Sequence, residues 1–391
     1  MSLKNTKLTE NKSTDLQNPQ SQLIACREAI DSIDQQLLHL INQRALQAKN
    51  IGLIKQQLPN NTSFYSPARE ADLLRKLGQI NQSDKHIIPN EKLLVVFREI
   101  ISLCLSLEKK QQIAYLGPAG TFTHAAALKH FGQFVDTIAL DSINDVFKAV
   151  ESEQSDYGVV PIENSTEGMV THTLDQFLNS SLHIVGEIEL KVQHCLLGAQ
   201  PDLSAEQGVG RNIKKIYAHQ QALAQCRNWL DLHYPDAERI ALSSNAKAAQ
   251  LVKDLAGEQP ESTAIASRAS ASIYKLQVIA ENIQDQPDNS TRFLILGREK
   301  IHPSKENKTS VLIATPNKPG ALYRLLESFY QANIDLTRIE TRPLRGYPWN
   351  YMFFIDFKGH ITEPHIKQLT ENIAKEANLF KHLGSYPISV L

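Results

Sequence analysis

Residues 21–57 read SQLIACREAIDSIDQQLLHLINQRALQAKNIGLIKQQ, and this stretch decides how the first part of the chain folds. It contains one glycine, Gly52, and no proline. Its apolar residues recur at helical spacing: Leu23, Ile30, Ile33, Leu37, Leu40, Ile41, Leu46, Ile51 and Ile54. A helix of these 37 residues would be about 55 Å long, far longer than an ordinary globular helix. A rod of that length needs a partner along it, so the stretch predicts an intertwined dimer.

Two further helices are expected before residue 110. The segment from Pro59 to Thr62 breaks the first helix. Ser66 and Pro67 then form a helix start, with serine as the N-cap and proline at the first helical position. The run Pro89-Asn90-Glu91 starts a third helix, which continues through LLVVFREIISLCLSLEKK. Residues 21–110 therefore predict an all-helical domain, and the polar residues 1–20 predict a disordered tail.

Residues 111–300 alternate short apolar strands with helical stretches, which is typical of an α/β domain. The expected strands are IAYLG, YGVVPI, HIVGEIEL, KIYAH, STAIAS and RFLILG. The expected helices are THAAALKHFG, SINDVFKAVES, QQALAQCRNWLDLH and NAKAAQLVKDLAG. The polar run from His302 to Lys308 is interpreted as a linker. Residues 309–391 then follow the order strand, helix, strand, strand, helix, strand, which is the ferredoxin-like split βαβ order.

Composition sets limits on the partners of the chain. Lys and Arg number 41 against 42 Asp and Glu, a net charge of −1, so no long-range field favours nucleic acid or an anionic membrane. No apolar run approaches the ~20 residues that span a bilayer, and the N-terminus has no apolar signal-peptide core. The four cysteines are widely spread: Cys26, Cys104, Cys195 and Cys226. They predict reduced thiols in the cytoplasm, and no His/Cys cluster has the spacing of a metal site.

Cations accompany the apolar helices. Arg44 and Lys55 are eleven residues apart, which places them on one helix face within about 20°. Arg27 lies seventeen residues before Arg44 and is about 100° off that face, so only a neighbouring rod in a dimer would bring an Arg27 to the same ligand. Taken singly, each cation also fits a solvated helix face.

The pattern Arg27…Arg44…Lys55…Arg69-Glu70 on three helices resembles the all-helical chorismate mutases. That family rearranges chorismate to prephenate by holding the reactive conformer and stabilising charge on the ether oxygen. The resemblance implies that three arginines bind or orient the carboxylates: Arg27 of the partner chain, Arg44 and Arg69. It implies four further contacts: Lys55 and Glu108 at the ether oxygen, Glu70 at the substrate hydroxyl, and Cys104 in the pocket wall.

Three positions depart from the best-known pattern of that family. Ser66, Cys104 and Glu108 stand where Asp, Ser and Gln are expected. Glu108 must be protonated to donate to an ether oxygen, and burial would favour this form while Lys55 would oppose it. We therefore expect mutase activity that falls as the pH rises.

Two polar stretches follow expected strands in the middle segment. VVPIENSTEGMV carries Glu163 to Thr166, and DNSTRFLIL carries Thr291 and Arg292. Polar groups at strand ends commonly line a cleft between lobes. A capped turn and a strand-edge salt bridge are the alternatives. The glycines of AYLGPAGTFTHAAA do not form a dinucleotide fingerprint, and no cofactor is expected.

These stretches together resemble prephenate dehydratase: GPAGTFTHAA, PIENSTEG, HCLLG, the region of His219, Gln221 and Gln225, and NSTRF. That family has two α/β lobes around a cleft and converts prephenate to phenylpyruvate with loss of carbon dioxide and water. The resemblance implies that Thr291 assists departure of the hydroxide, with Glu163 as the alternative acid. Arg292 would sit by a carboxylate or brace the loop. Further pocket residues are Thr121, Asn164, Ser165 and Gln221. Ala218 and Gln220 depart from the usual Ser and Pro, and His219 is interpreted as structural.

The C-terminal segment resembles the ACT regulatory domain of phenylalanine-controlled dehydratases. Two stretches carry the likeness, Pro319-Gly320-Ala321-Leu322 at a strand-to-helix turn and Glu340-Thr341-Arg342-Pro343 at the end of a strand. In that family such domains pair and bind phenylalanine at their interface. A salt-bridged helix start is the alternative interpretation. If the resemblance holds, deleting residues 304–391 should keep catalysis and lose feedback inhibition.

The order of the three resemblances is that of the bifunctional chorismate mutase–prephenate dehydratases of phenylalanine biosynthesis. The expected partners are chorismate, prephenate, L-phenylalanine and a second copy of the chain, with no nucleic acid and no membrane. Two alternatives stay open: a monofunctional prephenate dehydratase whose degenerate mutase domain serves dimerisation, and a two-lobed ligand-binding protein.

Overall fold

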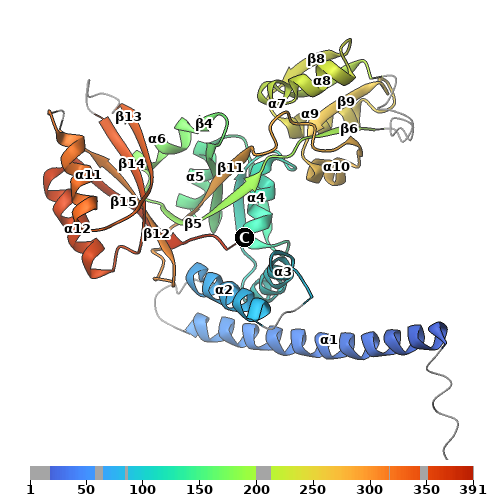
Figure 1. Cartoon of the computed structure of the whole chain (residues 1–391), viewed down its shortest axis with the longest axis horizontal. Coiled ribbons are helices and arrows are strands. Elements are labelled where there is room, and N and C mark those ends of the chain that lie inside the picture. Colours follow the sequence, from blue (N-terminus) through green and yellow to red (C-terminus); the bar gives the residue numbers. More distant parts are fainter. Residues whose placement is uncertain are drawn as a thin grey trace, which may run out of the picture.

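The computed structural model describes residues 18–57, 65–83, 87–199, 213–316, 318–343 and 351–390. Within these residues the chain forms a helical part, a two-lobed α/β part and a C-terminal α+β part (Figure 1). Residues 1–17 of the expected N-terminal tail and the expected helix break from Pro59 to Thr62 lie outside the described residues. The expected tail over residues 1–20 is wrong at its end, because Pro19 and Gln20 already belong to the first helix. No helix in the described ranges combines the length and the apolar character needed to cross a membrane.

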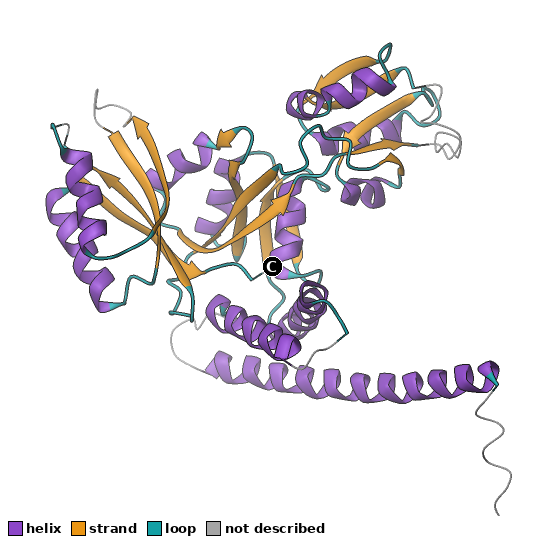
Figure 2. Ribbon diagram, viewed as in Figure 1, coloured by secondary structure: helices purple, strands orange, loops and turns teal. Residues whose placement is uncertain are grey.

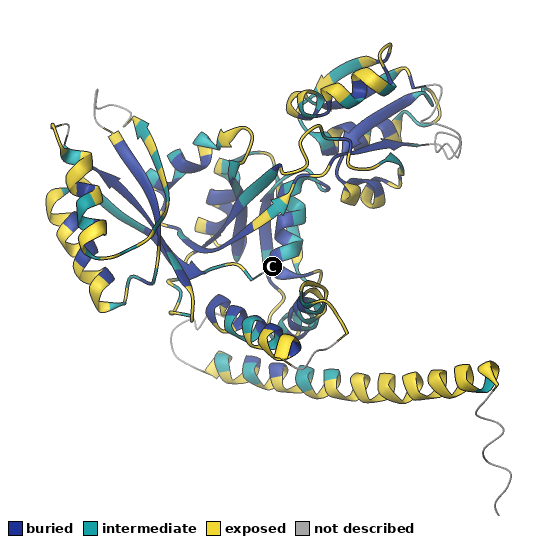
Figure 3. Cartoon of the chain, viewed as in Figure 1, coloured by how far each residue is buried: buried dark blue, intermediate teal, exposed yellow. Residues whose placement is uncertain are grey.

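The helical part consists of α1 (Pro19–Gln57), α2 (Pro67–Ser83) and α3 (Asn90–Glu108). The expected start of the second helix at Pro67 is confirmed, and α1 covers the long helix expected over residues 21–57. Gly52 lets α1 approach α3 closely, because a Cβ there would lie 3.1 Å from the Cα of Glu108. Most of α1 is nevertheless exposed, and only Ala48 and Gly52 are buried (Figure 3).

The first lobe of the α/β part is a mixed sheet with strand order β2-β1-β3-β11-β5, and β4 pairs with β3. Its strands are β1 (Gln112–Leu116), β2 (Asp136–Leu140), β3 (Tyr157–Asn164), β4 (Gly168–Met169), β5 (His183–Lys191) and β11 (Ser290–Gly297). Its helices are α4 (Phe122–Phe131), α5 (Ile143–Glu151) and α6 (Thr171–Asn179). The late strand β11 lies between β3 and β5 and is antiparallel to both.

The second lobe is a sheet with strand order β10-β6-β9-β7-β8. Its strands are β6 (Cys195–Gly198), β7 (Lys215–His219), β8 (Glu238–Leu242), β9 (Ser262–Ala266) and β10 (Gln277–Ala280). Its helices are α7 (Gln220–Gln225), α8 (Arg227–His233), α9 (Asn245–Asp254) and α10 (Arg268–Tyr274). The chain enters this lobe after β5 and returns to the first lobe as β11, so two chain crossings connect the lobes (Figure 1).

The single helix expected over residues 220–233 is wrong. The chain forms α7 and α8 with a break at Cys226. The carboxylate of Asp285 accepts hydrogen bonds from the backbone N–H groups of Asn228 (3.0 Å) and Trp229 (3.1 Å). This distant acid caps a new helix start, which apolar periodicity within the segment does not reveal.

The C-terminal part follows the expected order of strands and helices. Its elements are β12 (Asn307–Ala314), α11 (Ala321–Gln331), β13 (Leu336–Pro343), β14 (Tyr351–Lys358), α12 (Pro364–Glu376) and β15 (Leu379–Pro387). They form an antiparallel sheet in the order β13-β14-β12-β15. Figure 2 shows both helices on the face of this sheet that points away from the α/β part.

The run from His302 to Lys308 is not a free linker. Strand β12 already begins at Asn307, and the backbone N–H of Lys305 donates to Asp72 of α2 at 3.0 Å. Arg75 of α2 donates to the carbonyl oxygen of Ile388 at 2.6 Å. The helical part therefore holds both ends of the C-terminal part.

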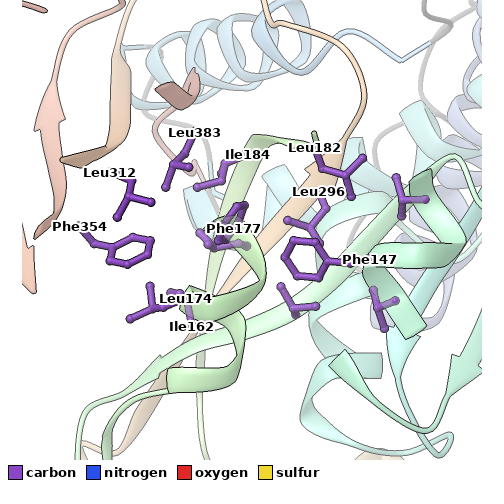
Figure 4. Packing of buried hydrophobic residues seen from close by; sticks show 14 of the residues in the cluster. Phe147, Ile162, Leu174, Phe177, Leu182, Ile184, Leu296, Leu312, Phe354 and Leu383 are labelled. Atoms are coloured by element: carbon purple, nitrogen blue, oxygen red, sulfur yellow. The ribbon is translucent and has the colours of Figure 1, made fainter. Parts of the chain in front are cut away.

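One hydrophobic core joins the C-terminal part to the first lobe. Leu312, Phe354 and Leu383 pack in one cluster with Phe177 and Ile184 of the first lobe (Figure 4). All five side chains are buried. The two parts therefore share a core, which links their stabilities.

Candidate active sites

A pocket of about 760 Å³ lies between the three helices and the segment that follows β11. Helices α1, α2 and α3 supply most of its wall, and residues 65–66 and 299–302 supply the rest. Four lysine and arginine side chains line it: Arg44, Lys55, Arg69 and Lys300. We call this site the helical pocket. Its cationic lining suits a small anion with more than one carboxylate.

Glu108 and Lys55 meet in the helical pocket. The Lys55 Nζ lies 3.5 Å from the Glu108 Oε2, and the Glu108 side chain is 10% exposed. Burial raises the pKa of Glu108, although Lys55, Arg44 and Arg69 act to lower it. The structure thus gives Glu108 a greater tendency to be protonated than an ordinary glutamate, as the sequence predicted.

Other expected mutase residues divide between the pocket and positions outside it. Cys104 is 1% exposed and lines the helical pocket. Arg44 also donates to the carbonyl oxygen of Ile100 at 3.4 Å, which ties it to α3. Arg27 is exposed on α1 and does not line the pocket of its own chain.

Glu70 does not line the helical pocket, so its expected contact with the substrate hydroxyl is wrong. Its carboxylate is buried and forms an ion pair with Arg98 of α3. Burial lowers the pKa of the Arg98 guanidinium. Glu70 therefore serves to neutralise a buried cation between α2 and α3.

A second pocket, of about 510 Å³, lies where the two lobes meet. We call it the inter-lobe cleft. Four expected residues line it: Thr121, Asn164, Gln221 and Thr291. They come from α4's start, β3, α7 and β11, which are far apart in the sequence.

The end of β3 and the start of β11 carry a hydrogen-bonded pair. The Asn164 Nδ2 donates to the Thr291 Oγ1 at 2.8 Å, and also to the Asn289 Oδ1 at 2.9 Å. The hydroxyl of Thr291 thus accepts a bond from Asn164, which leaves its own hydrogen to donate into the cleft. Ser165 does not line the cleft, and its hydroxyl instead accepts from the backbone N–H of Ser290 at 3.0 Å.

Thr121 and His219 each begin a helix at the edge of the cleft. The Thr121 hydroxyl accepts from the backbone N–H of His124 and donates to the carbonyl of Leu116 at 3.0 Å. The His219 Nδ1 accepts from the backbone N–H of Gln221 at 3.3 Å and caps α7. The structural role expected for His219 fits this geometry, although the ring also lines the cleft.

Glu163 and Arg292 do not line the inter-lobe cleft, which corrects their expected places there. Glu163 forms an ion pair with Arg338 of β13. Arg292 lies 2.7 Å from carboxylate oxygens of Glu187 and Asp356. Successive residues of a strand point to opposite faces, so the neighbours of Asn164 and Thr291 face the C-terminal part.

His194 is a cleft residue that we did not select from the sequence. Its Nε2 lies 2.9 Å from the Gln225 Oε1, and burial lowers its pKa. Its Nδ1 is buried and has no hydrogen-bond partner among the described residues. His194 begins the stretch HCLLG, which resembles prephenate dehydratase, and this resemblance could have pointed to it.

The residues expected to bind an effector lie at the start of α11 and on the edge strand β13. Gly320 has a φ of +79° and caps α11, a conformation that favours glycine. Thr341 pairs with Phe353, which packs among the helices, whereas Glu340 pairs with Phe354, which faces the first lobe. The expected residues therefore occupy two faces of β13. Arg342 has a buried Nε with no acceptor among the described residues.

Family models match both catalytic parts of the chain. Residues 26–109 match the model described as Chorismate mutase type II, and residues 113–301 match Prephenate dehydratase. The chain is thus an enzyme with a mutase domain followed by a dehydratase domain.

Known proteins match most of the chain. A bifunctional chorismate mutase/prephenate dehydratase of Pseudomonas aeruginosa is 49% identical over 95% of this chain and 99% of its own. The crystal structure of an Arthrobacter aurescens prephenate dehydratase in complex with L-Phe has a TM-score of 0.63 and 34% identity, over 71% of this chain and 90% of its own. A quorum-quenching acylase, GqqA, has a TM-score of 0.64 and 26% identity, over 72% of this chain and 98% of its own. The chain belongs to the bifunctional chorismate mutase/prephenate dehydratase family.

Proposed function

We propose that the helical pocket rearranges chorismate to prephenate and that the inter-lobe cleft converts prephenate to phenylpyruvate. Two observations support this assignment: the cationic helical pocket with its protonatable Glu108, and the Asn164–Thr291 pair in the cleft. The two pockets have separate linings, so each reaction has its own set of residues.

In the helical pocket, Arg44 and Arg69 bind the two carboxylates of chorismate. Lys55 and protonated Glu108 donate to the ether oxygen, on which charge develops as the bond breaks. No nucleophile is needed, because the rearrangement is unimolecular and depends on holding the reactive conformer. Cys104 contributes an apolar wall.

A second copy of the chain completes the helical pocket. The exposed face of α1 carries large apolar residues at heptad-like spacing: Ile30, Ile33, Leu37 and Leu40. A second α1 laid along this face would bury them and bring its Arg27 toward the first pocket. This supports a homodimer in which Arg27 of one protomer serves its partner.

In the inter-lobe cleft, Thr291 donates its hydroxyl hydrogen to the leaving hydroxide of prephenate. Asn164 fixes the direction of that hydroxyl by donating to its oxygen. Aromatisation of the ring supplies most of the driving force, so a positioned hydrogen-bond donor suffices. Thr121 and Gln221 contribute to the wall that holds the ring and its carboxylates. The buried His194 also borders this space.

Substitution of Thr291 tests the cleft assignment. We expect Thr291→Ala to lower the dehydratase kcat at least about 100-fold, the lower range for a positioned proton donor. Mutase activity of the same preparation should be unchanged, because Thr291 does not line the helical pocket. Thr291→Ser retains the hydroxyl and serves as the matched control. Dehydratase turnover in Thr291→Ala equal to that of the parent would reject the assignment.

The C-terminal part acts as an ACT domain that binds L-phenylalanine and inhibits the dehydratase. Three features support this: the glycine-capped start of α11, Thr341 on the edge strand β13, and the buried Nε of Arg342, which has no acceptor among the described residues. Their sequence motifs resemble those of phenylalanine-controlled dehydratases, and the Arthrobacter aurescens prephenate dehydratase is a complex with L-Phe. The four free cysteines fit a cytoplasmic enzyme.

A further inference from the structure

Two residue pairs on neighbouring strands face opposite directions. In the register of β3 and β11, Thr291 pairs with Asn164 and Arg292 pairs with Glu163. The first pair lines the inter-lobe cleft, and the second pair contacts the C-terminal sheet. Adjacent positions of one strand pair therefore carry the proposed catalytic hydroxyl and the contacts with the regulatory part.

Arg292 is anchored in the middle of the C-terminal sheet. Its Nη2 donates to the Asp356 Oδ2 at 2.7 Å and to the Tyr386 hydroxyl at 3.2 Å, and its Nε donates to the Glu187 Oε2 at 2.8 Å. Burial acts to lower the pKa of Arg292, but Asp356 and its other neighbours raise it overall. Asp356 belongs to β14 and Tyr386 to β15, both inside the sheet or its shared core. This anchor fixes β11 against the C-terminal part.

Glu163 is held by a different element, the edge strand β13. Its carboxylate forms an ion pair with Arg338, whose side chain is 28% exposed. The Nη1 of Arg338 also lies 3.5 Å from the Met169 Sδ. Met169 pairs with Glu163 across β4 and β3 and lines the inter-lobe cleft. One side chain of the C-terminal part thus contacts both strands of the β3–β4 hairpin at the cleft.

The tip of the hairpin is tied to the chain just before β11: the backbone N–H of Ser165 donates to the carbonyl oxygen of Ser290 at 2.9 Å, and the Thr166 hydroxyl donates to the Asn289 Oδ1 at 2.9 Å. A movement of the hairpin would therefore also reach the start of β11, where Thr291 lies. Residues 165–168 are exposed, and β4 is only two residues long. Arg338 shares its face of β13 with Glu340 and Arg342, since side chains alternate along a strand. A ligand that shifts β13 would therefore move Arg338, while the Arg292 anchor on β14 and β15 could stay in place.

We propose that Arg338 is a positioning residue for the dehydratase, and that its ion pair with Glu163 holds the end of β3 so that Asn164 can orient Thr291. The same contact carries the effect of phenylalanine from β13 to the cleft. This inference rests on the proposed role of Thr291. Arg338 touches no substrate and acts through the β3–β4 hairpin.

Removal of the Arg338 charge tests the positioning role in the full-length chain without phenylalanine. We expect Arg338→Met to lower the dehydratase kcat about tenfold with the KM for prephenate nearly unchanged, because a small misplacement of reacting groups is costly. Arg338→Lys, which keeps the charge, should recover most of the loss. Mutase activity reports that the chain is folded. Lys358→Met is the matched control, since it removes an exposed ion pair with Asp335 in the same part.

The double variant Glu163→Gln/Arg338→Met tests whether Glu163 and Arg338 act on the dehydratase through their ion pair or independently of each other. If the contact acts as a unit, the double variant should have the kcat of the more impaired single variant. The phenylalanine concentration for half-inhibition should also rise about tenfold in Arg338→Met, the order of a typical coupling between sites.

Three outcomes would overturn the inference: a parent-like kcat and half-inhibition in Arg338→Met, equal losses in Arg338→Met and Arg338→Lys, or losses that multiply in the double variant. An active Thr291→Ala would instead reject the proposed catalytic role. A parent that phenylalanine does not inhibit would reject the effector role, whereas the kcat comparison without phenylalanine would still test positioning.

Discussion

Glu108 illustrates how the surroundings of a single residue set its chemistry. Its carboxyl lies among three cations, which would normally keep it ionised. Burial on α3 nevertheless raises its pKa overall. A carboxyl in this state can donate a hydrogen bond to an ether oxygen, which a carboxylate cannot do.

The pH dependence of the mutase follows from this shift. The active acid form of Glu108 is present at low pH and is lost as the pH rises through its raised pKa, so kcat/KM for chorismate should fall on the alkaline side. Glu108→Gln donates through its amide at every pH and should flatten this limb. The measurement is mutase kcat/KM against pH for both proteins. An alkaline limb that is identical in the variant would contradict the assignment.

His130 predicts a pH dependence of stability. Its Nε2 lies 2.9 Å from the Tyr65 hydroxyl, and burial, with Arg98 nearby, lowers its pKa from 6.5 to about 3. In the unfolded chain the ring takes up a proton below pH 6.5, but in the folded chain it stays neutral. Stability is therefore lost as the pH falls through 6.5, by about 1.5 kcal/mol between pH 6.5 and pH 5.

The variant His130→Gln keeps a side chain that can bond Tyr65 but does not titrate. Between pH 6.5 and pH 5, the free energy of unfolding of this variant should fall by about 1.5 kcal/mol less than that of the parent. Urea unfolding at both pH values measures the difference. Equal losses in the two proteins would show that His130 is protonated in the folded state or does not contribute.

Among the elements, α1 is the one whose environment is least complete within a single chain. It is 39 residues long, and its large apolar side chains remain about half exposed. Helices α2 and α3 cover only its C-terminal portion, as Figure 3 shows. A long apolar stripe without cover is typical of a subunit interface.

A charge on the α1 stripe tests the proposed dimer. Leu37 is 50% exposed in one chain, and Leu37→Lys should give a monomer because the lysine would be buried against its partner. Mutase activity should fall by at least about tenfold with the loss of the partner's Arg27. Gln35→Lys, on the outer side of the same helix, is the control. Analytical ultracentrifugation gives the mass, and an unchanged dimer with full mutase activity would reject the interface.

In the complete chain, the first lobe and the C-terminal part share one hydrophobic core. Leu312 and Phe354 bring apolar surface from the C-terminal sheet, and Ile184 and Phe177 meet it from the first lobe. Beside this core, Asp356 neutralises Arg292, whose side chain is 13% exposed. The C-terminal part thus stabilises the first lobe, in addition to the regulatory role proposed for it.

Truncation tests this shared core. The sequence predicted that a chain without residues 304–391 keeps catalysis and loses inhibition, but the structure changes that expectation. Removal would expose the apolar face of the first lobe and leave Arg292 without Asp356, at a cost of several kcal/mol. We expect the truncated chain to lose dehydratase activity and melt at lower temperature, while the mutase persists. Retained dehydratase kcat with an unchanged melting temperature would contradict the shared core.

Part of the candidate sites could be predicted because the relevant spacing is local. Arg44 and Lys55 share a face of one helix, and both line the helical pocket. Alternation along β3 is equally local: Glu163 and Asn164 are adjacent in a strand, so they cannot both face the cleft. Thr291 and Arg292 follow the same alternation.

Periodicity within short segments was enough to predict the three helices of the mutase part and the strand and helix order of the C-terminal part. These depend on neighbours along the chain, which determine the hydrogen bonding of each element. The break at Cys226, the pairing of Glu70 with Arg98, and the contacts of Glu163 and Arg292 depend on residues from 28 to more than 170 positions away. Only the folded chain brings those groups together, because the packing of whole elements decides burial and charge pairing. The spacing of residues within one segment carries no information about that packing.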